Sequence, residues 1–200
     1  MKRLGNPSLL LGFVVFICFS AKAAFVNFET PPVHPVAISP DGQTLAVCNL
    51  PDNRVEFFDL NTQPPRPAGS LFVGLDPVSV RFRTANELWV VNHISSSISI
   101  VDVAKRQVVS TLDTLSGPAD VAFAGAPLQA FVTCANDRTV QVFDPVTHVV
   151  ITNLVIDGER PKAMAVSSSG SKVYVAIFES GNGSTILAPQ IGRASCRERV

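Results

Sequence analysis

The middle of the chain carries two short apolar segments separated by four residues: Leu-Trp-Val-Val-Asn at residues 88–92 and Ser-Ile-Ser-Ile-Val-Asp at residues 97–102. Both are rich in β-branched or aromatic residues and are bounded by Asn, Ser or Asp. This pattern is typical of short β-strands joined by a turn. Equivalent pairs of segments occur before and after this one, so it is the centre of a repeating unit.

The repeat has a nearly constant period. Segments equivalent to residues 88–92 begin at residues 45, 130 and 173, so successive starts lie 43, 42 and 43 residues apart. The aspartates that close the second segment, Asp59, Asp102 and Asp144, are separated by 43 and 42 residues. Such a regular period indicates a repeat architecture. Because one aspartate falls in each repeat, we expect these side chains to cap the following turn and not to share a metal.

Each period contains four predicted strands, at residues 78–82, 87–92, 97–102 and 107–112 in the second repeat. A lone four-stranded meander cannot bury both of its faces, so such units stack, and a β-propeller stacks them radially around a channel. We therefore predict an all-β fold, a β-propeller fragment of about four consecutive four-stranded blades. An immunoglobulin-like sandwich, the competing all-β arrangement, needs no internal repeat of this length.

The repeat resembles the YVTN-type β-propeller repeat over roughly residues 34–185. The resemblance is carried by Val-Ala-Ile-Ser-Pro-Asp-Gly at residues 36–42 together with the two segments quoted first. Thr-Ala-Asn at residues 84–86 departs from the Pro-Asp-Gly turn, and Cys134 stands where the other repeats have asparagine. The resemblance implies a seven-bladed parent of about 300 residues. The blades expected in this chain span about residues 34–74, 75–115, 116–157 and 158–190, the last one incomplete.

Both ends of the chain differ from the repeat region. Residues 1–23 combine Lys2 and Arg3 with an apolar run at residues 9–19 and Ala-Lys-Ala at residues 21–23, which is typical of a secretory signal peptide. The apolar run is too short to span a bilayer as a helix. We therefore predict a protein exported to the periplasm, the cell surface or the medium, with no membrane span in the mature chain. Residues 191–200 resemble a translated sequencing adapter and are predicted to be a non-native tail that truncates the natural chain.

The repeat region, residues 24–190, is mildly acidic. It contains 10 Lys and Arg against 15 Asp and Glu, a net charge of about −5. Without a basic patch we expect no nucleic-acid partner. Its two cysteines, Cys48 and Cys134, occupy non-equivalent positions in different repeats, which favours two separate buried thiols over a disulfide.

Candidate ligand-binding residues fall in two classes of loop at one mouth of the predicted channel: the loops between second and third strands and the loops between blades. They are His34, Asp76, His93, Asp137, Arg138 and Arg160. Three of them directly precede a proline and are expected to begin an innermost strand. Such a set suits a metal, a lactone or an acidic ligand. The simpler explanation is that loop residues are polar because loops are solvated.

Catalytic signatures are absent from the sequence. It contains no Cys-x-x-Cys-His, no His-x-x-x-His, no Gly-x-Ser-x-Gly and no Gly-rich phosphate loop. We therefore predict no catalytic residues, no metal ligands and no cofactor. The predicted function is a non-catalytic binding or interaction module of a larger periplasmic or surface protein, with a protein, glycan or small ligand as its partner. The alternative is part of a propeller enzyme, either lactonase-like or a quinone- or haem-linked oxidoreductase.

Overall fold

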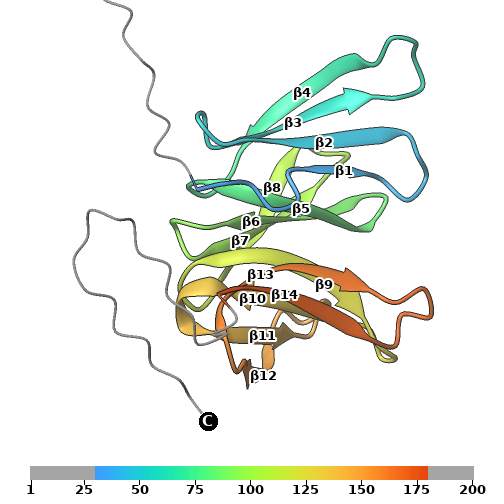
Figure 1. Cartoon of the computed structure of the whole chain (residues 1–200). Helices are drawn as coiled ribbons and strands as arrows, with labels where there is room; N and C mark the ends of the chain where they lie inside the picture. The colour runs from blue at the N-terminus through green and yellow to red at the C-terminus, as the bar shows by residue number, and fades with distance from the viewer. Residues whose placement is uncertain (1–29, 180–200) are drawn as a thin grey trace, which may run out of the picture.

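The computed structural model describes residues 30–179, which form four antiparallel sheets that follow one another along the chain (Figure 1). The first sheet contains β1 (Val36–Ile38), β2 (Thr44–Asn49), β3 (Arg54–Asp59) and β4 (Arg66–Phe72). The second contains β5 (Pro77–Thr84), β6 (Glu87–Asn92), β7 (Ser97–Asp102) and β8 (Gln107–Asp113). The third contains β9 (Pro118–Ala124), β10 (Gln129–Cys134), β11 (Thr139–Phe143) and β12 (Val150–Val155), with the short 3-10 helix η1 (Ala135–Asp137) between β10 and β11. The described part of the fourth is the pair β13 (Glu159–Val166) and β14 (Val173–Glu179).

The strands agree closely with the repeat found in the sequence. In the second sheet the two middle strands coincide with the predicted ranges, and the two outer strands extend them by three residues at most. Each four-stranded sheet is a simple meander, with every strand paired to its neighbours in sequence. The prediction of an all-β fold of successive meanders is confirmed, and we call the four sheets blades 1 to 4.

The core consists of layers between successive blades, because the central strands are apolar on both faces. Successive residues of a strand point to opposite sides of its sheet. In β6, Leu88 and Val90 belong to the layer shared with blade 1, while Trp89 and Val91 belong to the layer shared with blade 3. All four are fully buried. The Trp89 ring also meets the edge of Phe123 from β9, with ring centroids 5.3 Å apart.

The repeated aspartates cap turns, as the sequence predicted. Oδ1 of Asp102 accepts a hydrogen bond from the Lys105 amide at 2.9 Å, and Oδ1 of Asp144 accepts one from the Val146 amide at 2.8 Å. Asp59 makes the equivalent bond to the Asn61 amide. These bonds stabilise the carboxylate form: hydrogen bonds from Lys105 lower the pKa of Asp102, and backbone amides lower that of Asp144.

The innermost strands β1, β5, β9 and β13 lie side by side in the middle of the molecule (Figure 1). The segment that leads into β1 is fastened directly to β5. The Val33 amide donates to the Val78 carbonyl at 2.9 Å, and the Val80 amide donates to the His34 carbonyl at 2.9 Å, which makes a parallel bridge between His34 and Ser79. The start of blade 1 is therefore part of the inner edge of blade 2.

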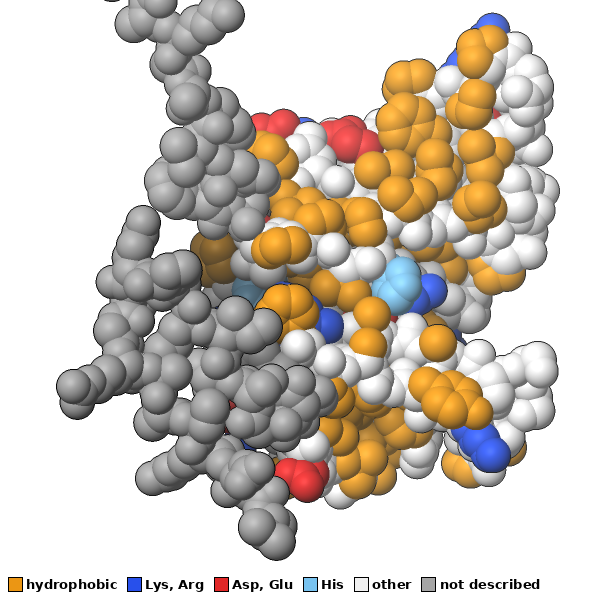
Figure 2. Space-filling view, viewed as in Figure 1, with side chains coloured by type: hydrophobic (Ala, Val, Ile, Leu, Met, Phe, Trp, Pro, Cys, Tyr) orange, Lys and Arg blue, Asp and Glu red, His pale blue; other side chains and the backbone are white. Residues whose placement is uncertain are grey.

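The two outer flanks of the described part expose apolar side chains. On β1, Val36 and Ile38 are 52% and 59% exposed, and hydrophobic side chains gather over blade 1 in the upper part of Figure 2. On β14, Tyr174 is 59% exposed. Tyr174 stands at the repeat position of the buried Trp89 but is exposed, because no described element covers that face of β14.

We expect the chain to self-associate through these flanks, since exposed contiguous apolar surface of this kind marks interaction or aggregation sites. The double change Val36→Lys and Ile38→Lys should reduce the apparent mass in light scattering coupled to size-exclusion chromatography. The matched control is Val109→Lys, which changes an equally exposed residue of β8 away from the flanks. A monomeric wild-type chain with a sharp, cooperative melt would contradict the prediction.

Candidate functional site

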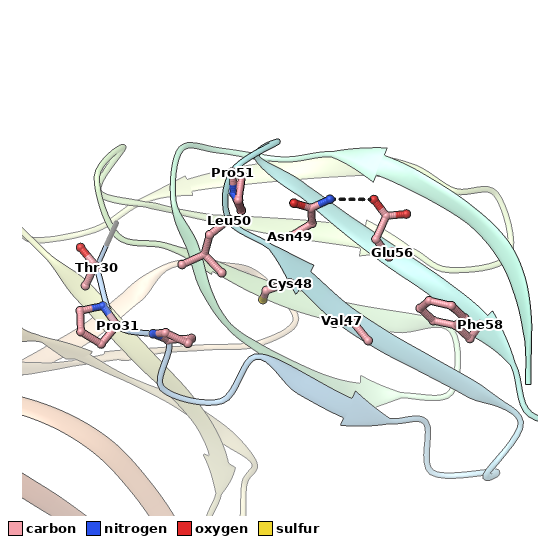
Figure 3. A pocket seen from close by; sticks show the side chains of 10 residues that line it. Thr30, Pro31, Val47, Cys48, Asn49, Leu50, Pro51, Glu56 and Phe58 are labelled. Atoms are coloured by element: carbon pink, nitrogen blue, oxygen red, sulfur yellow. Dashed lines mark hydrogen bonds between the residues drawn. The ribbon is translucent and has the colours of Figure 1, made fainter. Parts of the chain in front are cut away.

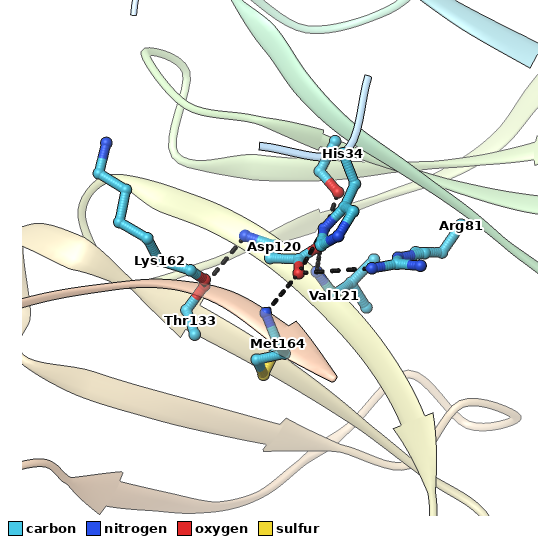
Figure 4. Close-up of polar contacts among 8 residues, drawn as sticks. His34, Arg81, Asp120, Val121, Thr133, Lys162 and Met164 are labelled. Atoms are coloured by element: carbon cyan, nitrogen blue, oxygen red, sulfur yellow. Dashed lines mark hydrogen bonds and ion pairs between the residues drawn. The ribbon is translucent and has the colours of Figure 1, made fainter. Parts of the chain in front are cut away.

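A buried carboxylate, Asp120 of β9, lies where the inner strands of all four blades meet (Figure 4). Its Oδ1 accepts hydrogen bonds from the Ser79 hydroxyl at 2.7 Å and from the Val121 amide at 2.9 Å. Its Oδ2 accepts one from the Met164 amide at 2.7 Å and lies 2.8 Å from Nδ1 of His34. Because His34, Ser79 and Met164 come from blades 1, 2 and 4, this one side chain of blade 3 links all four.

Further contacts complete the environment of Asp120. Its own amide donates to the Thr133 hydroxyl at 2.9 Å, and that hydroxyl donates in turn to the Lys162 carbonyl of β13 at 2.7 Å. The Arg81 guanidinium lies 3.7 Å from Oδ2 and is about one-third exposed. A fully buried carboxylate is tolerated when hydrogen bonds and positive charge compensate for its lost hydration. Asp120 has both.

The loop patterns of the sequence pointed to His34 but not to Asp120. Three of the six candidates directly precede the proline of an inner strand and the others lie in loops, whereas Asp120 is the second residue after Pro118, within a strand. The corresponding residues of the other blades are small: Ala37, Ser79 and Ala163. A single charged residue at a position that is small in every other repeat was the signal that could have found it.

The geometry of this cluster favours a structural role over a catalytic one. With Nδ1 donating to Asp120, the imidazole of His34 is fixed in orientation. A nucleophilic triad would need serine bonded to histidine and histidine bonded to aspartate. Ser79 and His34 instead bond to different oxygens of Asp120. The cluster is therefore not arranged as such a relay.

A second polar feature is a hollow of about 300 Å³ between blades 3 and 4. Arg138 and Arg160 line it together with Ala135, Asn136 and Glu159. Both arginines have left-handed backbone, with φ of 52° and 57°. The Arg138 carbonyl accepts a hydrogen bond from the Ile156 amide at 2.8 Å, which ties the loop of blade 3 to the loop that leads into blade 4. Two predicted site residues are thus brought to one hollow.

The other three predicted residues lie apart and make local contacts. Asp137 accepts a hydrogen bond from the Ser116 amide at 2.6 Å and so fastens two loops. His93 has Nδ1 2.9 Å from the Pro118 carbonyl, and its amide donates to the Asp76 carbonyl. Asp76 is only 4% exposed. The six candidates therefore do not form one site: His34 joins Asp120, Arg138 joins Arg160, His93 and Asp76 are linked through their backbones, and Asp137 bonds to Ser116.

A hollow of about 660 Å³ lies on the open flank of blade 1 (Figure 3). It is lined mainly by apolar side chains, among them Val47, Leu50 and Phe58, beside Thr30 and Pro31. Its walls belong to the uncovered face of blade 1. We interpret it as part of the flank and not as a ligand site.

The two cysteines of the described part are free and buried. Burial raises the pKa of the Cys48 thiol to about 12, with a smaller contribution from the charge of Asp76. Burial also raises the pKa of Cys134 to about 12, with a smaller contribution from Asp137. Thiols of this kind remain protonated at neutral pH and are poor nucleophiles.

Nowhere in residues 30–179 do three His, Cys, Asp or Glu side chains gather as they would around a metal ion. Among the same residues, no helix is both long and apolar enough to cross a membrane. The predicted signal peptide and the predicted non-native tail lie outside the described residues.

No protein-family model matches the sequence, and a search of curated proteins finds no match. Solved structures are similar in fold. A chain of the hydrazine synthase of Kuenenia stuttgartiensis aligns with a TM-score of 0.69 and 22% identity over 81% of this chain and 46% of its own. A proposed 6-phosphogluconolactonase of Bacteroides uniformis aligns with a TM-score of 0.62 and 14% identity over 76% of this chain and 49% of its own.

The successive antiparallel meanders and these likenesses define the chain as an all-β protein with the β-propeller fold. More particularly, it carries about four consecutive propeller blades, two strands of the last being described. The chain spans about half the length of the solved structures that it matches. At these identities the likeness concerns the fold alone.

We expect Asp120→Asn to lower the free energy of unfolding by about 2–4 kcal/mol, because the amide cannot accept all the hydrogen bonds that converge on the carboxylate. Urea denaturation followed by tryptophan fluorescence would measure the loss, since Trp89 is fully buried. The control is Asp113→Asn, which changes an exposed carboxylate at the end of β8. Equal stabilities of the two variants would contradict the assigned role of Asp120.

We also expect both cysteines to resist alkylation in the folded chain. At pH 8, a thiol with a pKa near 12 has a thiolate fraction of about one in ten thousand, roughly a thousand-fold below an ordinary thiol. The thiol pKa is higher in the folded chain than in the unfolded chain. The free energy of unfolding therefore keeps its full value below the ordinary thiol pKa and decreases as the pH rises from there toward 12. Mass spectrometry after iodoacetamide treatment, with and without urea, checks this. Rapid labelling of Cys48 or Cys134 in the folded chain would overturn it.

Proposed function

We propose that this chain is part of an exported β-propeller of the YVTN-repeat type that binds an acidic ligand at the loop end of its channel. The observation that carries the proposal is the shared hollow of Arg138 and Arg160. The proposed export rests on the sequence pattern of residues 1–23. The repeat type rests on the motifs quoted from the repeats, and the function is that of a binding module within a larger periplasmic or surface protein.

The chemistry of the hollow supports an anionic ligand. A guanidinium presents several N–H donors in a planar fork that matches a carboxylate or phosphate, and it stays charged at any physiological pH. Here two such groups come from loops of successive blades, while one carboxylate, Glu159, lines the same space. The size of the hollow suits a small acid or one acidic sugar of a glycan chain.

The neighbouring groups support binding more than catalysis. The Asp120 carboxylate is occupied by four donors, and the Ser79 hydroxyl is committed to it. The two thiols are buried and protonated. General acid–base and nucleophilic catalysis both require a group that can reach a substrate and change its protonation or bonding. These four side chains do not meet that requirement.

The proposal is tested by isothermal titration with citrate and with a galacturonate trisaccharide as acidic probes. Arg138→Gln and Arg160→Gln should each weaken binding of whichever probe binds by about tenfold, the loss expected for one charged contact. The control is Arg66→Gln, an exposed arginine on β4.

Absence of binding by the wild-type chain to either acid would contradict the proposal, as would equal affinities of wild type and both variants. A parallel assay with a gluconolactone addresses the enzyme alternative. Hydrolysis by the wild-type chain that is lost in His34→Gln would favour a lactonase-like function over a binding module.

A further inference from the structure

The carboxylate of Asp76 is buried without compensation. The residue is 4% exposed, and among the described residues neither carboxylate oxygen has a hydrogen-bond donor. A buried carboxylate without donors or a counter-charge costs several kcal/mol. The contrast with Asp120, whose oxygens are fully hydrogen bonded, is direct.

The backbone of Asp76 is held firmly in place. Asp76 has left-handed backbone with φ of 60° and is followed by Pro77. Its amide donates to the side-chain oxygen of Asn53 in blade 1 at 2.8 Å, and its carbonyl accepts from the His93 amide in blade 2 at 2.9 Å. Asp76 is therefore fixed between two blades by bonds on both sides.

A second orphaned acceptor belongs to the strand next to Asp76. Asn92 of β6 is fully buried and pairs with Pro77 in the sheet register. Its amide nitrogen donates to the hydroxyls of Ser97 and Ser99 at 3.2 and 3.0 Å. That oxygen, Oδ1, has no donor among the described residues.

Both orphaned groups belong to the layer between blades 1 and 2. Side chains of β6 alternate, so Asn92 lies on the same face as Val90, which contributes to the core shared with blade 1. Asp76 donates its amide hydrogen to Asn53 of blade 1 and directly precedes Pro77, the sheet partner of Asn92, so Asp76 lies beside Asn92 where blades 1 and 2 meet. Three acceptor oxygens without donors thus belong to one interblade layer.

The left-handed backbone at residue 76 does not require a carboxylate side chain. The equivalent residues of blades 3 and 4 are Gly117 and Arg160, which share the left-handed conformation, with φ of 66° and 57°. Blade 3 needs no side chain at all there. The acidic group of blade 2 therefore has a role beyond forming the turn.

We propose that Asp76 and Asn92 bind a hard cation, Ca²⁺, between blades 1 and 2. Ca²⁺ takes its ligands from carboxylate, amide and backbone carbonyl oxygens and from water, in a flexible geometry. One cation takes all three orphaned oxygens as ligands, and its positive charge offsets the negative charge of the buried carboxylate. A proton on Asp76 supplies one donor for three acceptors and so does not. Transition metals are disfavoured, since they prefer imidazole or thiolate ligands.

The test is thermal unfolding of the full chain after treatment with EDTA and after addition of CaCl₂. We expect Ca²⁺ to raise the Tm of the wild type by about 5 °C, because a ligand of the native state alone stabilises it. In Asp76→Asn the Ca²⁺ effect should vanish. In EDTA this variant should melt at or above the wild type, since it lacks the buried charge. A merely structural aspartate would give a variant less stable than wild type in EDTA.

Equilibrium dialysis with ⁴⁵Ca gives a second readout, expected near one ion per wild-type chain and none per Asp76→Asn chain. Asp113→Asn, which removes an exposed carboxylate, is the matched control and should bind as wild type does. The inference is overturned if the wild type binds no Ca²⁺, in which case water occupies the layer, or if Asp76→Asn binds equally. Either result leaves the acid-binding proposal unaffected, because Arg138 and Arg160 line a hollow between other blades.

Discussion

The need to cover both faces of every sheet governs this molecule. The middle strands of each blade are apolar on both sides, so a blade in isolation would leave one large hydrophobic face in water. In blade 2 both faces are covered, and Trp89 and its neighbours are fully buried. In blades 1 and 4 one face remains open within the described residues, and residues such as Ile38 and Tyr174 are exposed there. The same residue positions are thus core or surface according to whether a neighbour is present.

Polar groups in the interior divide into two kinds. Asp120 is surrounded by donors from all four blades and has an arginine nearby, so its burial is compensated by the protein itself. Asp76 and the oxygen of Asn92 are also buried, but no described residue donates a hydrogen bond to them. The hydrogen bonds of Asp120 are complete within the protein. Asp76 and Asn92 instead need a bound ligand to compensate for their burial, and this difference separates a structural carboxylate from a ligand-binding one.

The fold followed from the sequence because it depends on periodic features. A period near 42 residues and the alternation within strands are local and repeated, so they predicted the strands of blade 2 to within a few residues. The capping aspartates were predicted for the same reason. The site was harder because it depends on which side chains converge. Asp120 lies 86 residues from His34 in sequence, and no local sequence pattern predicts the contact between them. Likewise, Tyr174 has the sequence environment of Trp89 and differs only in its neighbour.

The four-way attachment of Asp120 has a consequence for how the protein folds. Blades that touch only their neighbours behave as a one-dimensional array, which can gain or lose terminal units one at a time. A side chain in blade 3 that is bonded to blades 1, 2 and 4 adds couplings that skip a neighbour. Such couplings penalise partly folded arrays, in which some blades are formed and others are not. Asp120 thereby makes a chain of semi-independent modules fold and unfold more nearly as a single cooperative unit.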